Sequence, residues 1–78
     1  MNTKHFGRIM RERRENAYIS LCALSDLVDM SEHALRSIEL GDSDPKLSNV
    51  LKIAGALQID VGTLNSCIPV SLHYTERN

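Results

Sequence analysis

Apolar residues recur three and four positions apart along most of the chain, and short polar connections interrupt the pattern. This spacing places apolar side chains on one face of a helix. It predicts five short helices, over about residues 3–16, 20–28, 32–40, 45–57 and 60–67. The chain is therefore expected to fold as an all-α domain. The residues predicted to face its core are Phe6, Ile9, Met10, Leu24, Leu27, Val28, Met30, Leu35, Ile38, Leu47, Val50, Leu51, Ala54 and Leu57.

Residues that favour helix ends support these boundaries. Ser20, Ser31 and Asp60 each stand at the N-terminal end of a predicted helix, where a side-chain oxygen can accept a hydrogen bond from an otherwise unpaired N–H group. Gly41 follows the third helix, at the position where a positive φ costs glycine little. Pro45 lies at or near the start of the fourth helix, after a polar turn. The last residues, 69–78, form a tail or a strand whose signal is weak.

The second and third predicted helices are joined by only a few residues, as in a helix-turn-helix. In that motif the first helix lies across the DNA backbone and the second enters the major groove. Ser25 supplies a small residue where the two helices would cross, and Asp29 tolerates the left-handed backbone that the turn needs. Helix pairs are common, so this spacing alone leaves the function open.

Charge is distributed unevenly along the sequence. The net charge is −1, but residues 1–14 hold five of the nine basic residues and only one of the ten acidic residues. This asymmetry predicts a basic edge on an acidic body. A solvated first helix without a nucleic-acid partner would show the same pattern, so the charge does not decide the function.

A set of residues spread over much of the chain resembles the Xre/Cro family of repressors. The resemblance extends roughly from Phe6 to Leu64, and no single part of it is diagnostic; its strength lies in the order and spacing. The matching residues are Arg14, Ile19-Ser20, Ser31, Ile38-Glu39, Gly41, Pro45, Leu47, Leu51-Lys52-Ile53-Ala54, Ala56-Leu57, Asp60-Val61 and Leu64.

The resemblance implies a compact five-helix, lambda-repressor-like DNA-binding domain over residues 1–68, followed by the tail 69–78. It also implies a sequence-specific transcriptional regulator, a dimeric autorepressor that binds a near-palindromic operator in double-stranded DNA. Repressors of this family usually dimerise through their C-terminal part, and apolar residues there exceed what one short helix can bury. The expected homodimer contacts are Val61, Leu64, Cys67, Ile68 and Val70. Packing of the same residues on the fourth helix is the alternative.

Carried over by position, the base-reading residues would be Glu32, His33, Arg36 and Ser37. An arginine can donate two hydrogen bonds to guanine, a glutamate can accept from cytosine N4, and a histidine can donate to a purine acceptor. The same polar residues could equally be the solvent face of an amphipathic helix.

The resemblance also assigns contacts outside the base edges. Arg14 and Glu39 stand where the family forms an ion pair between the first helix and the end of the third. The residues expected to contact phosphate are Arg11, Arg14, Ser20, Ser31 and Ser43.

Three features depart from the family pattern. Leu21 stands where a glutamine often contacts the DNA backbone and braces the recognition helix. Asp42 and Asp44 occupy a loop that is commonly basic, and Glu32 begins the recognition helix with an acid. Each carboxylate near phosphate weakens the electrostatic part of the affinity. An antitoxin or a protein-interaction module on the same fold, binding a toxin or another regulator, is therefore the alternative.

Other function classes find little support. His5, His33 and His73 have no metal-ligand spacing, Cys22 and Cys67 lie far apart, and neither a nucleophile elbow nor a phosphate-binding glycine loop occurs. We expect no enzyme activity, no metal and no cofactor. Without a recognisable signal peptide or membrane span, we expect a cytoplasmic protein with free thiols.

Overall fold

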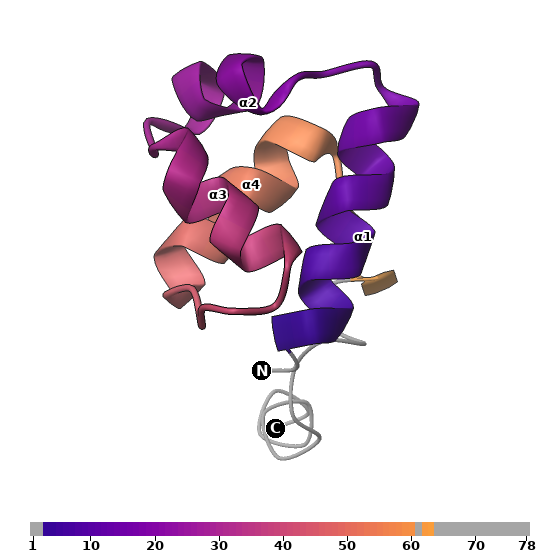
Figure 1. Ribbon diagram of the computed structural model, residues 1–78. Helices are drawn as coiled ribbons and strands as arrows, with labels where there is room; N and C mark the ends of the chain where they lie inside the picture. Colours follow the sequence, from indigo (N-terminus) through magenta and orange to yellow (C-terminus); the bar gives the residue numbers. More distant parts are fainter. Residues whose placement is uncertain (1–2, 61, 64–78) are drawn as a thin grey trace.

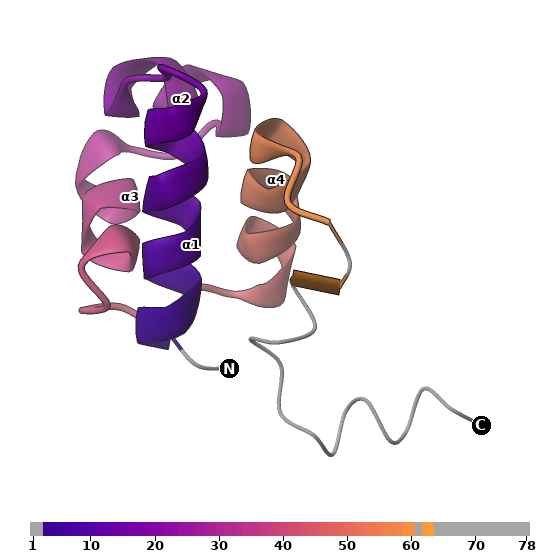
Figure 2. The same ribbon diagram turned by 90° about the vertical axis from the view of Figure 1, so that its right-hand side faces the viewer.

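Four helices follow one another along the chain in the computed structural model, which describes residues 3–60 and 62–63. They are α1 (Thr3–Asn16), α2 (Leu21–Val28), α3 (Glu32–Glu39) and α4 (Leu47–Leu57). In the turned view α1 stands between α3 and α4, and in both views α2 lies across the end of this arrangement where α1 finishes (Figures 1 and 2). No strand occurs in the described part of the chain, as predicted for an all-α domain.

The core forms where the apolar faces of all four helices meet. Phe6 and Met10 of α1, Leu24 of α2 and Leu35 of α3 are completely buried. Burying a side chain of this size stabilises the fold by about 1.5–3 kcal/mol relative to leaving it exposed. The remaining buried apolar residues are Val28, Ile38, Val50, Ile53, Ala54, Leu57 and Ile59.

Three leucines predicted to face the core are instead exposed, so that part of the prediction was wrong. Leu27, Leu47 and Leu51 keep 64%, 57% and 54% of their surface accessible. On α4 the apolar stripe is wider than the face that meets α1 and α2, so Leu47 and Leu51 lie on its flank. The completely buried Ile53, which the core prediction omitted, takes a central position beside Val50.

The predicted helix ends agree closely with the structure. The hydroxyl oxygens of Ser20 and Ser31 accept hydrogen bonds from the N–H groups of Ala23 and Ala34, both at 3.0 Å. Gly41 follows α3 with a φ of +77°. The fourth helix starts at Leu47, two residues after Pro45, and its N-terminus has no side-chain cap.

Only the beginning of the predicted fifth helix lies within the described residues. The Asp60 carboxylate accepts a hydrogen bond from the Thr63 N–H group at 3.3 Å, which is the contact expected of an N-cap. Residues 62 and 63 are helical. Residues 61 and 64–67, and the tail 69–78, lie outside the described residues, so a fifth helix remains a prediction.

Candidate nucleic-acid interface

The second and third helices are joined by a tight left-handed turn. Asp29 ends α2 with φ 55° and ψ 48°, and its N–H group donates to the Ser25 carbonyl. The Met30 N–H group donates to the same carbonyl at 3.2 Å. An aspartate tolerates this backbone conformation better than most residues because its short polar side chain can make local hydrogen bonds. The two helices therefore meet at a fixed turn, which is the geometry of a helix-turn-helix.

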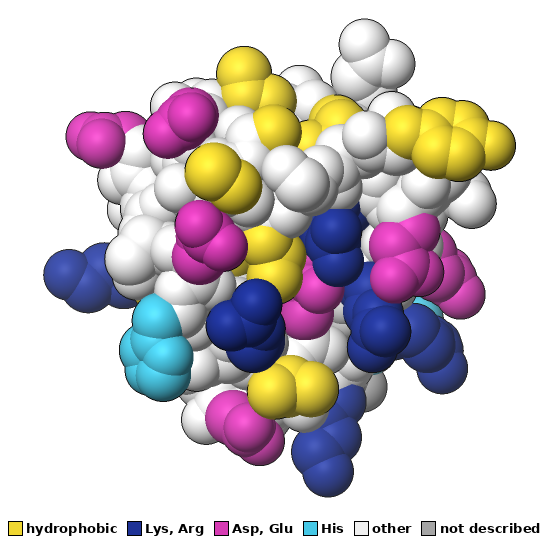
Figure 3. All heavy atoms as spheres, turned by 45° about the horizontal axis from the view of Figure 1, so that its top comes forward, with side chains coloured by type: hydrophobic (Ala, Val, Ile, Leu, Met, Phe, Trp, Pro, Cys, Tyr) yellow, Lys and Arg dark blue, Asp and Glu magenta, His cyan; other side chains and the backbone are white. Residues whose placement is uncertain are grey.

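One face of α3 is polar and turned to solvent. Leu35 and Ile38 are buried against the other helices, while Glu32, His33 and Arg36 are exposed and Ser37 is half-buried. Figure 3 shows acidic, basic and histidine side chains interspersed with apolar ones on the surface around α2 and α3. The four residues predicted to read bases are thus on one helix and accessible to a ligand.

An ion pair fixes α1 to the end of α3. Arg14 Nε donates to Glu39 Oε2 at 2.6 Å and Nη2 donates to Oε1 at 3.1 Å, while Nη1 donates to the Ile19 carbonyl at 2.9 Å. The side chains of Arg14 and Glu39 keep only 13% and 6% of their surface exposed. The hydrogen bonds that Arg14 donates to Glu39 raise the pKa of the arginine above its ordinary value. This bidentate geometry holds the orientation of α3 relative to α1.

The two helices also approach each other closely at Gly7, a contact that the sequence analysis did not identify. A Cβ atom at this position would collide with the carbonyl oxygen of Ile38 and would lie 3.0 Å from that of Glu39. Glycine is therefore required by the packing of α1 against α3. Its place among the polar residues of α1 gave no indication of this contact.

The basic residues of α1 divide between two sides of the helix. Arg14 faces α3, and Arg11 is exposed with its Nε 3.1 Å from Glu15 Oε2. Arg13 instead turns toward the end of α4, where Nη1 donates to the Gln58 carbonyl at 3.4 Å and Nη2 lies 3.9 Å from Asp60. The basic edge predicted from composition is therefore not one continuous surface.

The remaining residues predicted to contact phosphate are distributed around α3. The Ser20 and Ser31 hydroxyls cap α2 and α3, so their oxygens are already engaged. Ser43 is exposed in the loop after α3, at the opposite end of that helix from Ser31. Contacts at these serines would come from backbone N–H groups or from hydroxyl hydrogens, both of which can donate to phosphate.

A hollow of about 190 Å³ opens between α1, the start of α2 and the exposed side of α3. It brings Arg36 of α3 together with Arg11 and Arg14 of α1, which are distant from it in the sequence. The complete lining is Arg11, Arg14, Leu21, Arg36, Glu39 and Leu40. The structure therefore places Arg36, predicted to read a base, beside the two arginines predicted to contact phosphate.

Acidic residues lie near both ends of α3. The negative charge of Glu32, and secondarily that of Asp26, raises the pKa of the exposed Cys22 thiol above its ordinary value. Asp29 is exposed nearby, and Asp42 and Asp44 are exposed in the loop after α3. Negative charge near the two ends of α3 is unfavourable to a phosphate ligand.

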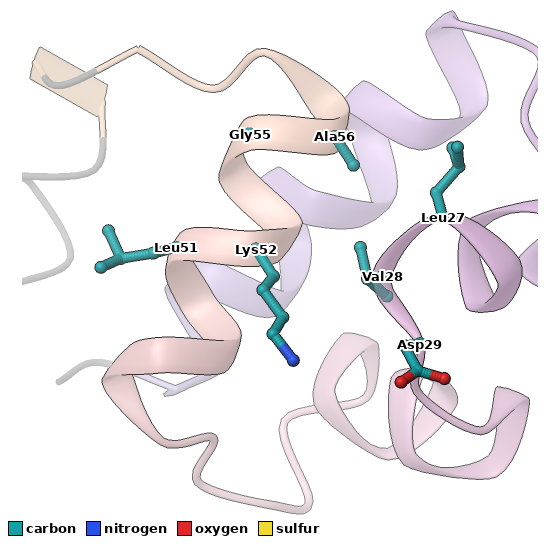
Figure 4. A pocket seen from close by; sticks show the side chains of 7 residues that line it. All are labelled: Leu27, Val28, Asp29, Leu51, Lys52, Gly55 and Ala56. Atoms are coloured by element: carbon teal, nitrogen blue, oxygen red, sulfur yellow. The ribbon is translucent and has the colours of Figure 1, made fainter.

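A second, larger hollow of about 520 Å³ opens at the surface between α2 and α4. Its lining is mainly apolar, with Leu27 and Val28 on one side, Ala56 on the other, and Asp29 and Lys52 near one end (Figure 4). Leu51 points away from α2 (Figure 4). The groove lies away from the arginine-lined hollow and has a different chemical character.

Comparison with known protein families agrees with this geometry. A helix-turn-helix family model matches residues 10–64, more than half of the chain. The protein belongs to the Xre/Cro-type helix-turn-helix family. A search of curated proteins finds no significant match.

The described part of the chain shows neither a metal-ligand cluster nor a membrane-spanning helix. Within residues 3–60 and 62–63, no three His, Cys, Asp or Glu side chains are grouped as metal ligands would be. None of the helices in this part of the chain has the length and apolar character needed to cross a membrane. Val61, Leu64, Cys67, Ile68 and Val70, the predicted dimer contacts, lie outside the described residues.

Proposed function

We propose that this protein is a sequence-specific, dimeric transcriptional repressor that binds its own operator. The family consists of DNA-binding regulatory domains, and the coarser assignment to DNA-binding transcription regulators follows from membership. The observation that supports the finer proposal best is the Arg14–Glu39 pair. It holds α3, with its exposed polar face, in a fixed orientation relative to the rest of the domain.

Base recognition is assigned to the outer face of α3. His33 can donate to a purine acceptor, Ser37 can either donate or accept a hydrogen bond, and Glu32 can accept from cytosine N4. Arg36 extends from the same helix and can reach either a guanine edge or a phosphate. Each good base contact would contribute about 1–3 kcal/mol of discrimination against the wrong base pair.

The dimer is assigned to the C-terminal side of the domain. The predicted contacts Val61, Leu64, Cys67, Ile68 and Val70 follow α4 directly in the sequence. Leu47 and Leu51 add exposed apolar surface on the flank of α4. Two copies related by a two-fold axis would present two α3 helices to successive major grooves, which accounts for a near-palindromic operator.

Fluorescence anisotropy with two labelled duplexes tests the proposal. One duplex carries the DNA upstream of the protein's own coding sequence, and the other carries the same bases in scrambled order. We expect tighter binding to the upstream duplex at each of two salt concentrations. The double variant His33→Ala/Ser37→Ala should lose this preference, while Ser48→Ala on the exposed side of α4 should keep it. Equal affinity of the wild type for both duplexes would contradict sequence-specific binding.

The groove between α2 and α4 supports a second candidate function, an antitoxin or another protein-interaction module. Leu27 exposes 64% of its surface at this groove, beside the exposed backbone of Gly55. An apolar side chain of a partner could cover this region without blocking α3. Co-purification with the product of a neighbouring gene, lost in Leu27→Asp and retained in Asp42→Asn, would support this function.

A further inference from the structure

The hollow between α1 and α3 is lined by more basic than acidic side chains. Three guanidinium groups and one carboxylate line it. Both oxygens of Glu39 accept hydrogen bonds from Arg14, so this carboxylate already has its partner. The Arg36 side chain is exposed. Its guanidinium makes no hydrogen bond or ion pair with any residue in 3–60 or 62–63, while its backbone carbonyl accepts a hydrogen bond from the Leu40 N–H group. The Arg36 guanidinium is therefore available to bind an anion.

Arg11 can contribute to the same anion site. Its contact with Glu15 joins two side chains that are 57% and 54% exposed. Ion pairs between such exposed side chains are weak, so an anion in the hollow can compete with Glu15 for the guanidinium. Arg14 holds the arrangement in place through its three hydrogen bonds.

Two leucines give the hollow an apolar wall beside these charges. Leu21 is half-buried at the start of α2, and Leu40 exposes 57% of its surface at the end of α3. Apolar walls exclude water and strengthen charge-assisted hydrogen bonds. The ligand that fits best combines an anionic group with an apolar neighbour, as one deoxyribose phosphate of DNA does. At about 190 Å³ the hollow is smaller than the pockets of roughly 300–1,000 Å³ that bind drug-sized molecules.

We propose that one phosphate of the DNA backbone binds in this hollow, held by Arg36 and Arg11, with its deoxyribose against Leu21 and Leu40. Arg36 then anchors the recognition helix to the backbone and does not read a base. Leu21, which replaces the glutamine common in the family, forms the apolar wall of this site. The proposal rests on the proposed DNA-binding function and assigns a ligand group to one part of its surface.

The dependence of binding on salt tests this role for Arg36. Each phosphate contact with a basic side chain contributes about 0.9 to the slope of log K against log salt concentration. Arg36→Ala should weaken binding to the upstream and the scrambled duplex by the same factor, about tenfold or more, and should reduce the slope by about one. Arg36→Lys should retain the slope because it keeps the charge. Lys52 is an exposed basic residue on α4. Lys52→Ala is the matched control and should change neither the affinity nor the salt slope.

The possible outcomes separate this proposal from the function on which it rests. If Arg36→Ala weakens binding only to the upstream duplex and relaxes the preference at one base pair, then Arg36 reads a base. The phosphate site would be overturned and the regulator function would stand. If the wild-type protein binds neither duplex at low salt, both proposals are overturned. An equal loss on both duplexes with a reduced slope supports the phosphate site.

Discussion

Arg14 and Glu39 join α1 to the end of α3 through two hydrogen bonds, and the same arginine donates a third to the carbonyl of Ile19. Ile19 immediately precedes the N-cap of α2, so one guanidinium carried by α1 contacts both the connection before α2 and the end of α3. Because both side chains are largely buried, water competes little for these bonds. The position of α3 therefore depends on this pair as well as on the apolar core.

Removal of the Glu39 carboxylate should destabilise the domain. Glu39→Ala leaves Arg14 as a largely buried charge without its partner, which is expected to cost about 1–3 kcal/mol in the free energy of unfolding. Urea denaturation monitored by circular dichroism measures this quantity. Glu15→Ala removes an exposed pair with Arg11 and should change stability by less than about 0.5 kcal/mol. An unchanged unfolding midpoint in Glu39→Ala would show that the pair does not stabilise the fold.

Replacement by alanine should have opposite effects on stability at two glycines that lie in helices. Gly7→Ala places a Cβ against the carbonyl oxygens of Ile38 and Glu39, whereas a Cβ at Gly55 meets nothing within 4 Å. We expect Gly7→Ala to cost about 1–3 kcal/mol through overpacking. We expect Gly55→Ala to stabilise the protein by about 0.5–1 kcal/mol, because alanine favours helix. Thermal unfolding should show a lower melting temperature for Gly7→Ala and a higher one for Gly55→Ala than for the wild type. Similar melting temperatures in the two variants would contradict the close approach at Gly7.

The connection between α1 and α2 contains a strained residue at the surface. Tyr18 has a φ of 58° and exposes 96% of its surface, so it accepts a left-handed backbone without burying its ring. Tyr18→Gly should stabilise the domain by about 0.5–1 kcal/mol, because glycine adopts this conformation without a Cβ clash. Tyr18→Ala retains the Cβ atom and should give no such gain. A destabilised Tyr18→Gly variant would show that the ring makes a contact that outweighs the backbone strain.

The reactivity of Cys22 should report the charge at the start of α3. Glu32 is the largest cause of the raised pKa of this thiol, so less thiolate is present at a given pH than in an ordinary cysteine. In a Cys67→Ser background, Glu32→Gln should move the alkylation profile of Cys22 to lower pH. Asp42→Asn removes one negative charge near the other end of α3 and should not shift the pH dependence of Cys22 alkylation. Equal shifts in both variants would show that net charge, and not proximity to Glu32, governs the thiol.

Local features of the fold could be predicted from the sequence with good accuracy. Ser20 and Ser31 were assigned as N-caps, Asp29 as a left-handed turn residue and Gly41 as the end of α3, and the structure shows each of them in that place. These assignments succeed because caps and turns depend on a few neighbouring residues. The Arg14–Glu39 pair was expected from the family resemblance and not from local chemistry.

Burial could be predicted less well, because it depends on which faces the other helices cover. Leu27, Leu47 and Leu51 fit the apolar periodicity as well as Leu24 and Val50 do, yet they are exposed. Periodicity identifies an apolar stripe, but only the crossing of the helices determines how much of that stripe is covered. The requirement for glycine at position 7 has the same origin, since it comes from the backbone of α3.

The sequence by itself determined the four described helices, the N-caps of α2 and α3, the left-handed turn between these two helices and the family to which the chain belongs. Only the tertiary structure decided which charged residues act together. It turned Arg13 toward Gln58 and Asp60, and it brought Arg36 to Arg11 and Arg14 around one hollow. The physical reason is that helix formation is set by neighbours along the chain. The direction of a long side chain is set by the helices packed around it, and these come from distant parts of the sequence.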